Sequence, residues 1–354
     1  MKRLIAFAGL ALAAVVGSLG FASTASATPT CTPYTDSSAT YPADGTHFYV
    51  CVPSPNSARR STIITTIRGL PRKASPSDPD KAYDVLKNNG VTIFWFYDRV
   101  DGNDFMSTSS PWSGSTSYQS TTARCGYTGK AAAAGTVTQI YDNCLTNSGS
   151  TLFQNPSLQN TTLHEAGHAY DFSRFYQPSR TAGYATATSP LNLIESDLNA
   201  LTPSNWSTMT NAQKDSTVCT IFSNIAPSAL EIDLGATSGA VCMGSGSSMT
   251  RNSAYLSKTP TDIAKEKLPY FLDGSLAGVI KYQEAWAEQF AITGGVQTGL
   301  TNFLQLTDRV LSNSQNFRCS RFVVQRYMNN GAPPTQAEMT ANSCPAQGAP
   351  GNQL

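Results

Sequence analysis

The five residues at positions 164–168 read His-Glu-Ala-Gly-His. Four residues make about one turn of α-helix, so His164 and His168 are expected on the same face of one helix. Two imidazoles placed in this way could bind a single Zn²⁺, with Glu165 beside them to act on a water that the metal activates. The stretch therefore predicts a zinc hydrolase built around one active-site helix, and a peptidase in particular.

The glutamate has a second explanation. Thr162 and Glu165 have the spacing of a helix capping box, in which Thr162 would cap the helix and Glu165 would be its third residue. A capping box explains Glu165 but leaves the second histidine unexplained. We therefore prefer the metal interpretation.

Outward from the motif, the pattern predicts a mixed α+β fold. The motif helix is expected to begin near Ser157 or Asn160 and to end at about Phe175, before Pro178. β-branched and aromatic runs predict strands, whereas 101–130 is expected to be a long polar loop. The predicted strands are Ser61–Ile67, Val91–Tyr97 and Gly135–Tyr141, and the other predicted helices are Asp80–Asn89, Lys281–Ala291 and segments within 190–275 and 300–329.

The N-terminus has the pattern of a secretory signal peptide over residues 1–27. Lys2 and Arg3 precede an apolar run, and Ala25-Ser26-Ala27 is a small-residue cleavage site. We therefore expect a secreted, extracellular protein. The apolar run is too short for a membrane anchor, and no later stretch is expected to span a membrane.

Eight cysteines agree with export, because an even number in an exported chain predicts disulfides. Neighbouring cysteines form four couples along the sequence, and we expect sequential pairing. The expected pairs are Cys31–Cys51, Cys125–Cys144, Cys219–Cys242 and Cys319–Cys344.

Net charge argues against a nucleic-acid partner. The chain has 24 basic and 23 acidic residues, and we see no basic stripe. A serine hydrolase is also disfavoured, because the motif leaves only His47 for a triad and the chain has no Gly-x-Ser-x-Gly.

A catalytic zinc usually takes three protein ligands and keeps one position for water. His47 is the only other histidine and is far from the motif in sequence, so a carboxylate is expected as third ligand. Asp171 shares the helix face but lies about 10 Å along the axis from His164, which favours a supporting role.

Two further carboxylates, Glu284 and Glu288, lie four residues apart among Ala285, Trp286 and Phe290. Burying two acids on an apolar helix is unfavourable unless they are paired or bound to metal. If they serve a metal site, Glu284 would be the ligand and Glu288 would orient an imidazole. The alternative is a pair of exposed acids on a surface helix.

The two helices together resemble the anthrax lethal-factor-like zinc metallopeptidases. The resemblance rests on His-Glu-Ala-Gly-His-Ala-Tyr-Asp, followed about 115 residues later by Glu-Ala-Trp-Ala-Glu-Gln-Phe. It implies His164, His168 and Glu284 as ligands of one Zn²⁺ and Glu165 as general base. It also implies a tyrosine seven residues before the ligand glutamate as oxyanion donor, where this chain has Ala277. Tyr270, or else Tyr282, is expected to replace it.

The resemblance implies a zincin-like catalytic domain of two lobes over residues 61–330. The N-lobe, 61–178, would hold a small twisted sheet and the active-site helix, and the C-lobe, 190–330, would be mainly helical. Either Val91–Tyr97 or Gly135–Tyr141 is the expected edge strand for substrate. A disulfide-tied strap, 28–60, would precede this domain and a polar tail, 331–354, would follow it.

These expectations describe a secreted zinc-dependent endopeptidase that acts as a monomer on a peptide or protein substrate. The alternative is a secreted adhesin or binding module in which zinc is structural. A structural zinc is normally closed by four protein ligands, whereas this chain offers three clear ones.

Overall fold

The structure is a computed structural model of the chain. It describes residues 29–33, 48–51, 57–121, 125–131, 135–142, 158–175, 189–222, 241–244, 248–267, 279–297, 310–311 and 313–346. The predicted signal peptide, His47, Tyr270 and Ala277 lie outside these ranges.

One mixed sheet of five strands, in the order β1-β2-β3-β5-β4, lies beside the motif helix. β2, β3 and β5 run parallel to one another, while β1 pairs antiparallel with β2 and β4 pairs antiparallel with β5. The outer strands are therefore β1 and β4. The strands are β1 (Cys31–Pro33), β2 (Phe48–Cys51), β3 (Thr92–Phe96), β4 (Gly126–Ala131) and β5 (Gly135–Tyr141).

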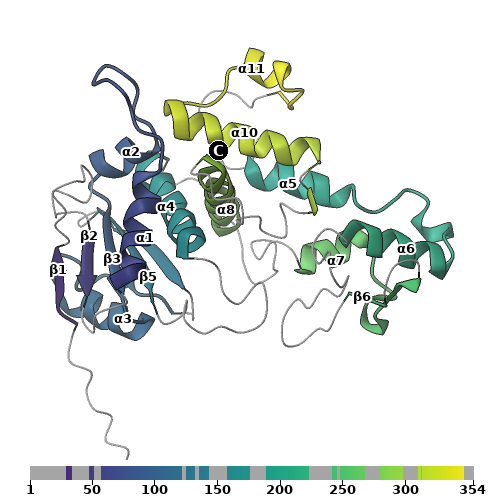
Figure 1. The fold of residues 1–354 in the computed structure, drawn as a ribbon, viewed down its shortest axis with the longest axis horizontal. Helices are drawn as coiled ribbons and strands as arrows, with labels where there is room; N and C mark the ends of the chain where they lie inside the picture. Colours follow the sequence, from purple (N-terminus) through teal and green to yellow (C-terminus); the bar gives the residue numbers. More distant parts are fainter. Residues whose placement is uncertain are drawn as a thin grey trace, which may run out of the picture.

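Helices surround this sheet and extend away from it. In Figure 1 the sheet lies on one side, α6, α7 and β6 lie on the other, and α4 and α8 lie between them. The longer helices are α1 (Ser57–Arg68), α2 (Ala82–Asn88), α3 (Arg99–Thr108), α4 (Leu158–Arg174), α5 (Pro190–Asn199), α6 (Asn211–Phe222), α7 (Pro260–Lys267), α8 (Val279–Gln297), α10 (Gln315–Asn330) and α11 (Gln336–Ala341). A two-stranded ribbon, β6 (Cys242–Met243) with β7 (Thr250–Arg251), lies near α6.

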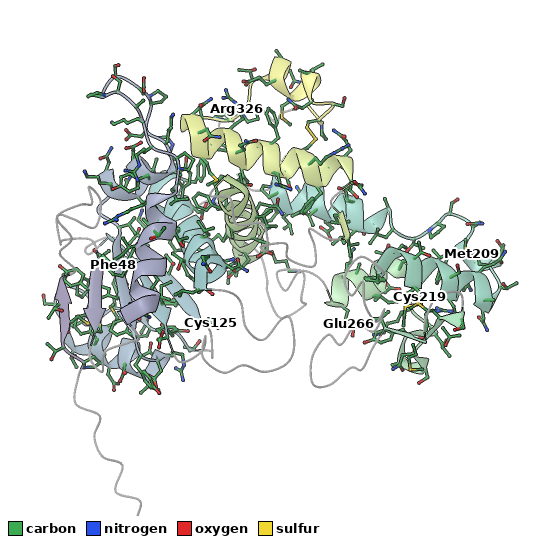
Figure 2. All side chains as sticks on the ribbon, in the orientation of Figure 1. Phe48, Cys125, Met209, Cys219, Glu266 and Arg326 are labelled. Carbon is green, nitrogen blue, oxygen red and sulfur yellow. A yellow bond between two sulfur atoms is a disulfide. The ribbon has the colours of Figure 1, made fainter. Side chains whose placement is uncertain are left out.

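Within the described ranges the buried apolar side chains form three clusters, and α8 takes part in two of them. Trp286 and Phe290 belong to the cluster between the sheet and α1, α2, α4 and α10. Ala285 and Ile292 belong to a second cluster that includes α5, α6 and α7. A helix that is apolar on several faces is expected to be buried on several faces, and α8 follows this rule. Figure 2 shows the side chains in place.

The mixed α+β class predicted from the sequence is confirmed. The predicted motif helix corresponds to α4, the helix at Asp80–Asn89 to α2, and the helix at Lys281–Ala291 to α8. The strands predicted at Val91–Tyr97 and Gly135–Tyr141 correspond to β3 and β5. Residues 28–60, expected as a separate strap, contribute β1 and β2 to the main sheet.

The strand predicted at Ser61–Ile67 is wrong, because these residues lie in helix α1. Ile63, Ile64, Ile67 and Leu70 are all buried, and this spacing is that of one helix face. Packing against the rest of the core therefore outweighs the strand preference of a β-branched run.

The long loop predicted at 101–130 is wrong in part, since it contains most of α3, a 3₁₀ turn (Thr116–Tyr118) and most of β4. Helix α3 is capped by Asp98, whose carboxylate accepts a hydrogen bond of 2.9 Å from the Asp101 amide. Gly102 lets α3 approach the sheet, because a Cβ there would lie 2.6 Å from Gln139 Oε1. These determinants are polar or long-range, so the apolar pattern did not indicate them.

Three of the predicted disulfides are confirmed: Cys31–Cys51, Cys219–Cys242 and Cys319–Cys344. They join β1 to β2, α6 to β6, and α10 to the segment after α11. Figure 2 marks Cys219 on α6. Cys125 is also disulfide-bonded, and its predicted partner Cys144 lies outside the described residues.

The segment expected as a polar tail, 331–354, contains the short helix α11, which begins with a capping box between Thr335 and Glu338. Across the described ranges, every helix is too short or too polar to cross a membrane.

Candidate metal centre

Helix α4 carries both motif histidines. It begins at Leu158, so Glu165 lies well inside the helix. The Thr162 hydroxyl donates a 2.7 Å hydrogen bond to the Leu158 carbonyl oxygen. Thr162 is therefore an interior residue of α4, and the capping-box explanation of Glu165 is wrong.

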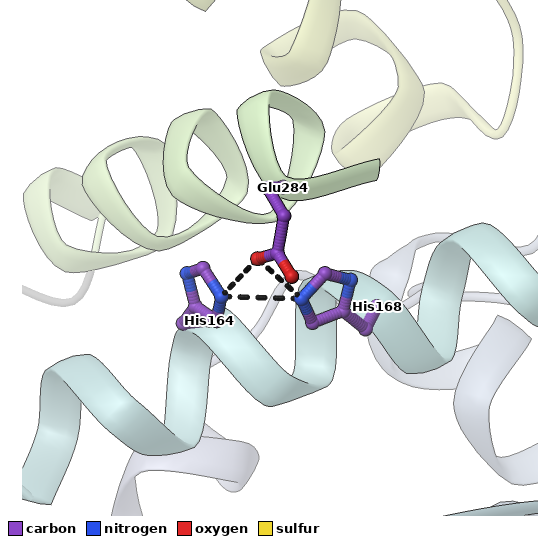
Figure 3. Close-up of side chains that lie close together, drawn as sticks. All are labelled: His164, His168 and Glu284. Atoms are coloured by element: carbon purple, nitrogen blue, oxygen red, sulfur yellow. Dashed lines mark hydrogen bonds and ion pairs between the residues drawn. The ribbon is translucent and has the colours of Figure 1, made fainter. Parts of the chain in front are cut away.

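Glu284 reaches the two histidines from α8. Its Oε2 atom lies 3.1 Å from His164 Nε2 and 3.0 Å from His168 Nε2. The two imidazole nitrogens are themselves 3.1 Å apart. Figure 3 shows the three side chains pointing toward one another across the gap between α4 and α8. Residues separated by about 120 positions thus bring three donor atoms to one point.

The close approach of α4 and α8 depends on small residues. A Cβ atom on Gly167 would lie 2.8 Å from Ala287 Cα and 2.9 Å from Phe290 Cβ. The indole Nε1 of Trp286 also donates a 3.1 Å hydrogen bond to the Gly167 carbonyl oxygen. The contact falls between the two histidines, and it sets the spacing of the site.

The charges at this cluster favour a cation. Burial opposes the charged form of His164, but hydrogen bonds to Glu284 and Glu288 and the charges of Glu284 and Glu165 outweigh it and raise the pKa of His164 to about 10. Burial likewise opposes ionisation of Glu284, yet His168 and His164 hold the pKa of Glu284 well below its usual range. The carboxylates thus hold a positive charge in the cluster.

Glu288 lies one turn after Glu284 on α8 and is also buried. Its Oε2 atom is 3.6 Å from His164 Nδ1, on the side of the ring opposite Nε2. Glu288 is therefore placed to set the orientation of the imidazole while Nε2 faces Glu284. The alternative expectation of two exposed acids on a surface helix is wrong.

Glu165 points to the sheet rather than to α8. Its side chain is buried, and its Oε2 atom accepts a 2.6 Å hydrogen bond from the Thr128 hydroxyl on β4. Its charge still acts on His164, the preceding residue on α4. One carboxylate therefore lies beside the cluster without belonging to it.

The donor atoms of His164, His168 and Glu284 suit a metal ion in type, number and spacing. A tetrahedral zinc with bonds of about 2.0–2.1 Å would space its donors about 3.3 Å apart, close to the separations found here. Two nitrogens and one oxygen are also a common catalytic donor set, which leaves a fourth position for water. The residues present therefore fit a zinc ion.

No family model, curated protein or solved structure matches the chain. The chemistry of the site therefore rests on its own geometry.

The remaining predicted site residues are spread more widely. Asp171 is fully buried on α4, outside the three-residue group. The Tyr282 hydroxyl is 3.5 Å from Asn192 Oδ1 on α5, so this side chain is directed to α5. Tyr270 lies outside the described residues, and its role stays a prediction.

Three residues near the site were not singled out from the sequence: Gly126, Thr128 and Gly167. Gly167 gave a usable signal, because a glycine inside a helical motif indicates close packing. The segment around Gly126 and Thr128 is polar and glycine-rich, so only the pairing of β4 with β5 brings it to Glu165.

Proposed function

We propose that the chain is a secreted zinc-dependent endopeptidase that hydrolyses peptide bonds through a metal-activated water. The observation that carries the proposal is the arrangement of His164 Nε2, His168 Nε2 and Glu284 Oε2 at 3.0–3.1 Å from one another. Glu165, a carboxylate outside the donor set, lies next to this group on the same helix.

The fold around the site supports a zincin-like arrangement of two lobes. The motif helix α4 lies against β4 and β5 of a small mixed sheet, as expected for the N-lobe. A second, largely helical cluster lies on another side of α8, as expected for the C-lobe. The disulfides agree with an oxidising, extracellular location.

The edge strand for substrate needs a correction. β3 and β5 were expected to offer an edge, but both are interior strands, and the edge beside α4 is β4. Tyr141 donates its backbone N–H to the Cys125 carbonyl, so in the alternating ladder the N–H and C=O of Gly126 and Thr128 point away from β5. We assign β4 as the strand along which an extended peptide would bind.

The proposed mechanism divides the work between the ion and the chain. A bound zinc ion would supply a Lewis acid that lowers the pKa of water to about 7. Glu165 would accept the proton of the attacking water and pass it to the leaving amine. Because Oε2 is held by Thr128, Oε1 is the atom assigned to the proton. Tyr270 remains the proposed donor to the oxyanion.

The deciding experiment compares the mature chain with the Glu165→Gln variant on a peptide library, with cleavage sites mapped by mass spectrometry. We expect cleavage by the wild-type chain, loss of cleavage with a chelator, and a Glu165→Gln variant that binds zinc but does not cleave. Glu195→Gln is the matched control, because Glu195 is a partly exposed glutamate on α5 outside the group of His164, His168 and Glu284.

Full peptidase activity in the Glu165→Gln variant would contradict the mechanism. A wild-type chain that binds zinc and cleaves nothing in the library would instead favour the secreted binding module with a structural metal.

A further inference from the structure

The edge strand β4 is shaped around the side chain of Glu165. Gly126 and Thr128 are two residues apart, so they share one face of the strand, and this face is turned to α4. Both residues lie against the carboxylate of Glu165. Their contacts are independent of each other, since one is a hydrogen bond and the other is a steric opening.

The hydrogen bond is directional. A carboxylate only accepts, so Thr128 donates its one O–H to Glu165 Oε2 over 2.6 Å. Thr128 Oγ1 is also 3.1 Å from the hydroxyl of Thr138, its register partner on β5. Because the Thr128 proton is already used, Thr138 must be the donor in that contact. The two threonines form a short chain of hydrogen bonds that ends on Glu165.

The steric opening is at Gly126. A Cβ atom there would lie 2.6 Å from Glu165 Cγ, 2.7 Å from Oε1 and 2.9 Å from Cδ. These are the three nearest atoms, and all belong to Glu165. Gly126 has no left-handed backbone that would itself require glycine, since its φ is not positive. The absence of a side chain at this position therefore makes room for the carboxylate.

We propose that Gly126, Thr128 and Thr138 form a carboxylate cradle that fixes Glu165 for proton transfer, with Thr128 as a positioning residue. The inference rests on the proposed peptidase function and goes beyond it, because it assigns the orientation of the base to the sheet. Oε2 is the held atom, and Oε1 is the atom left for the proton.

The cradle also connects the base with the proposed substrate strand. The backbone of Thr128 points to the outer edge of β4, while its hydroxyl holds Glu165. A peptide bound along β4 would therefore be in register with the residue that orients the base. Fixing a reacting group in this way removes rotational freedom before the reaction, which raises the rate of the chemical step more than it tightens binding.

The first test asks whether the Thr128 hydroxyl orients Glu165 or is merely a buried polar group. Thr128→Val keeps the shape but removes the hydroxyl, and Thr128→Ser restores it. We expect Thr128→Val to lower kcat about 10- to 100-fold with a small change in KM and unchanged zinc content. We expect Thr128→Ser to recover most of the activity. Thr136→Val is the matched control, because Thr136 is also a buried threonine and lies on the same face of β5 as Thr138.

The second test moves the carboxylate without removing a hydrogen-bonding group. In Gly126→Ala, the flexible end of Glu165 must yield, since the three atoms nearest to the added methyl group all belong to that side chain. We expect kcat to fall while zinc content and the unfolding temperature stay near those of the wild type.

A third measurement does not depend on activity. In the metal-free chain, Thr128→Val and Glu165→Ala are combined in a double-mutant cycle read by denaturant unfolding. Coupled residues give a double variant that is less destabilised than the sum of the single variants. Additive effects would overturn the cradle, as would a Thr128→Val variant with the wild-type kcat or a Thr128→Ser variant as impaired as Thr128→Val.

Failure of the two proposals can be told apart. If the wild-type chain cleaves peptides and Thr128→Val does so equally well, only the cradle is overturned. If the wild-type chain binds zinc without cleaving any peptide, the proposed function fails, and the catalytic meaning of the cradle fails with it.

Discussion

The indole Nε1 of Trp286 donates a 3.1 Å hydrogen bond to the carbonyl oxygen of Gly167, the residue directly before His168. The donor is on α8, two residues after Glu284, and the acceptor is on α4. One hydrogen bond therefore joins the helix that carries the histidines to the helix that carries the third donor. The variable positions of the His-Glu-x-x-His motif thus have a packing role in this chain.

Gly167→Ala should disturb both stability and metal binding. The added methyl group would meet the Ala287 backbone at 2.8 Å, and backbone cannot yield as easily as a side chain. We expect the free energy of unfolding to fall by about 1–3 kcal/mol and zinc affinity to fall as α8 moves away from α4. Denaturant unfolding and zinc titration measure the two effects.

Gly294→Ala is the control for this prediction. A Cβ at Gly294 would first meet the ends of the Leu163 and Met328 side chains, at 3.1 and 3.5 Å. We expect this variant to keep its zinc affinity. If both glycine variants lost zinc affinity equally, the Gly167 contact would not be what spaces the donor atoms.

Trp286→Phe tests the hydrogen bond itself. Trp286 is fully buried and stacks on Tyr170, so phenylalanine keeps most of the apolar contact but removes the donor. We expect the free energy of unfolding to fall by about 1–3 kcal/mol, measured by denaturant unfolding.

Trp95→Phe separates the hydrogen bond from the lost ring volume. Trp95 is equally buried on β3, and within the described residues its Nε1 has no hydrogen-bond partner. The Trp95→Phe variant should therefore lose less unfolding free energy than the Trp286→Phe variant. An equal loss in the two variants would mean that ring volume, and not the hydrogen bond, explains the effect.

The sequence predicted the parts of this molecule that depend on strong local patterns. The run at Val91–Tyr97 is so rich in β-branched and aromatic residues that this local pattern is enough to predict β3. Histidine is scarce, so a carboxylate was the expected third donor, and Glu284 does lie beside His164 and His168. Its place on a mostly apolar helix was itself a signal, because an unpaired buried acid is unfavourable.

The sequence did not predict the parts that depend on long-range pairing. The segment around Thr128 has no alternating apolar pattern, and its role follows from the register Thr128↔Thr138 and from the position of α4. The same limit explains α1, where burial of Ile63, Ile64 and Ile67 on one helix face decides against the strand that β-branched residues favour. In both segments the residues packed against a position, rather than its own residue type, determine the local structure.

Glu288→Gln should weaken zinc binding without removing a donor atom. Glu288 Oε2 lies 3.6 Å from His164 Nδ1, so its charge supports the imidazole from the side opposite the cluster. Loss of such a partner typically lowers metal affinity about 10- to 100-fold, and we expect this range in a zinc titration against a competing chelator. Glu266→Gln, at an exposed glutamate on α7, should bind zinc as the wild type does. Wild-type affinity in Glu288→Gln would show that the imidazole needs no such support.

Removal of zinc should lower the stability of the folded chain, because the donor atoms come together only when α4 and α8 are packed. A ligand that binds only the folded state stabilises it by about 4 kcal/mol when its free concentration is about 1000 times Kd. We therefore expect zinc to raise the unfolding temperature of the metal-free chain and a chelator to reverse the effect.

Glu284→Gln is the informative variant for this experiment. It keeps the size of the side chain but removes the charge that holds a cation between the histidines. Its unfolding temperature should respond little to zinc, while that of Glu195→Gln, at a partly exposed glutamate on α5, should respond as the wild type does. A zinc-dependent rise of the same size in Glu284→Gln and the wild type would mean that the ion binds elsewhere and that the cluster between α4 and α8 is not the metal site.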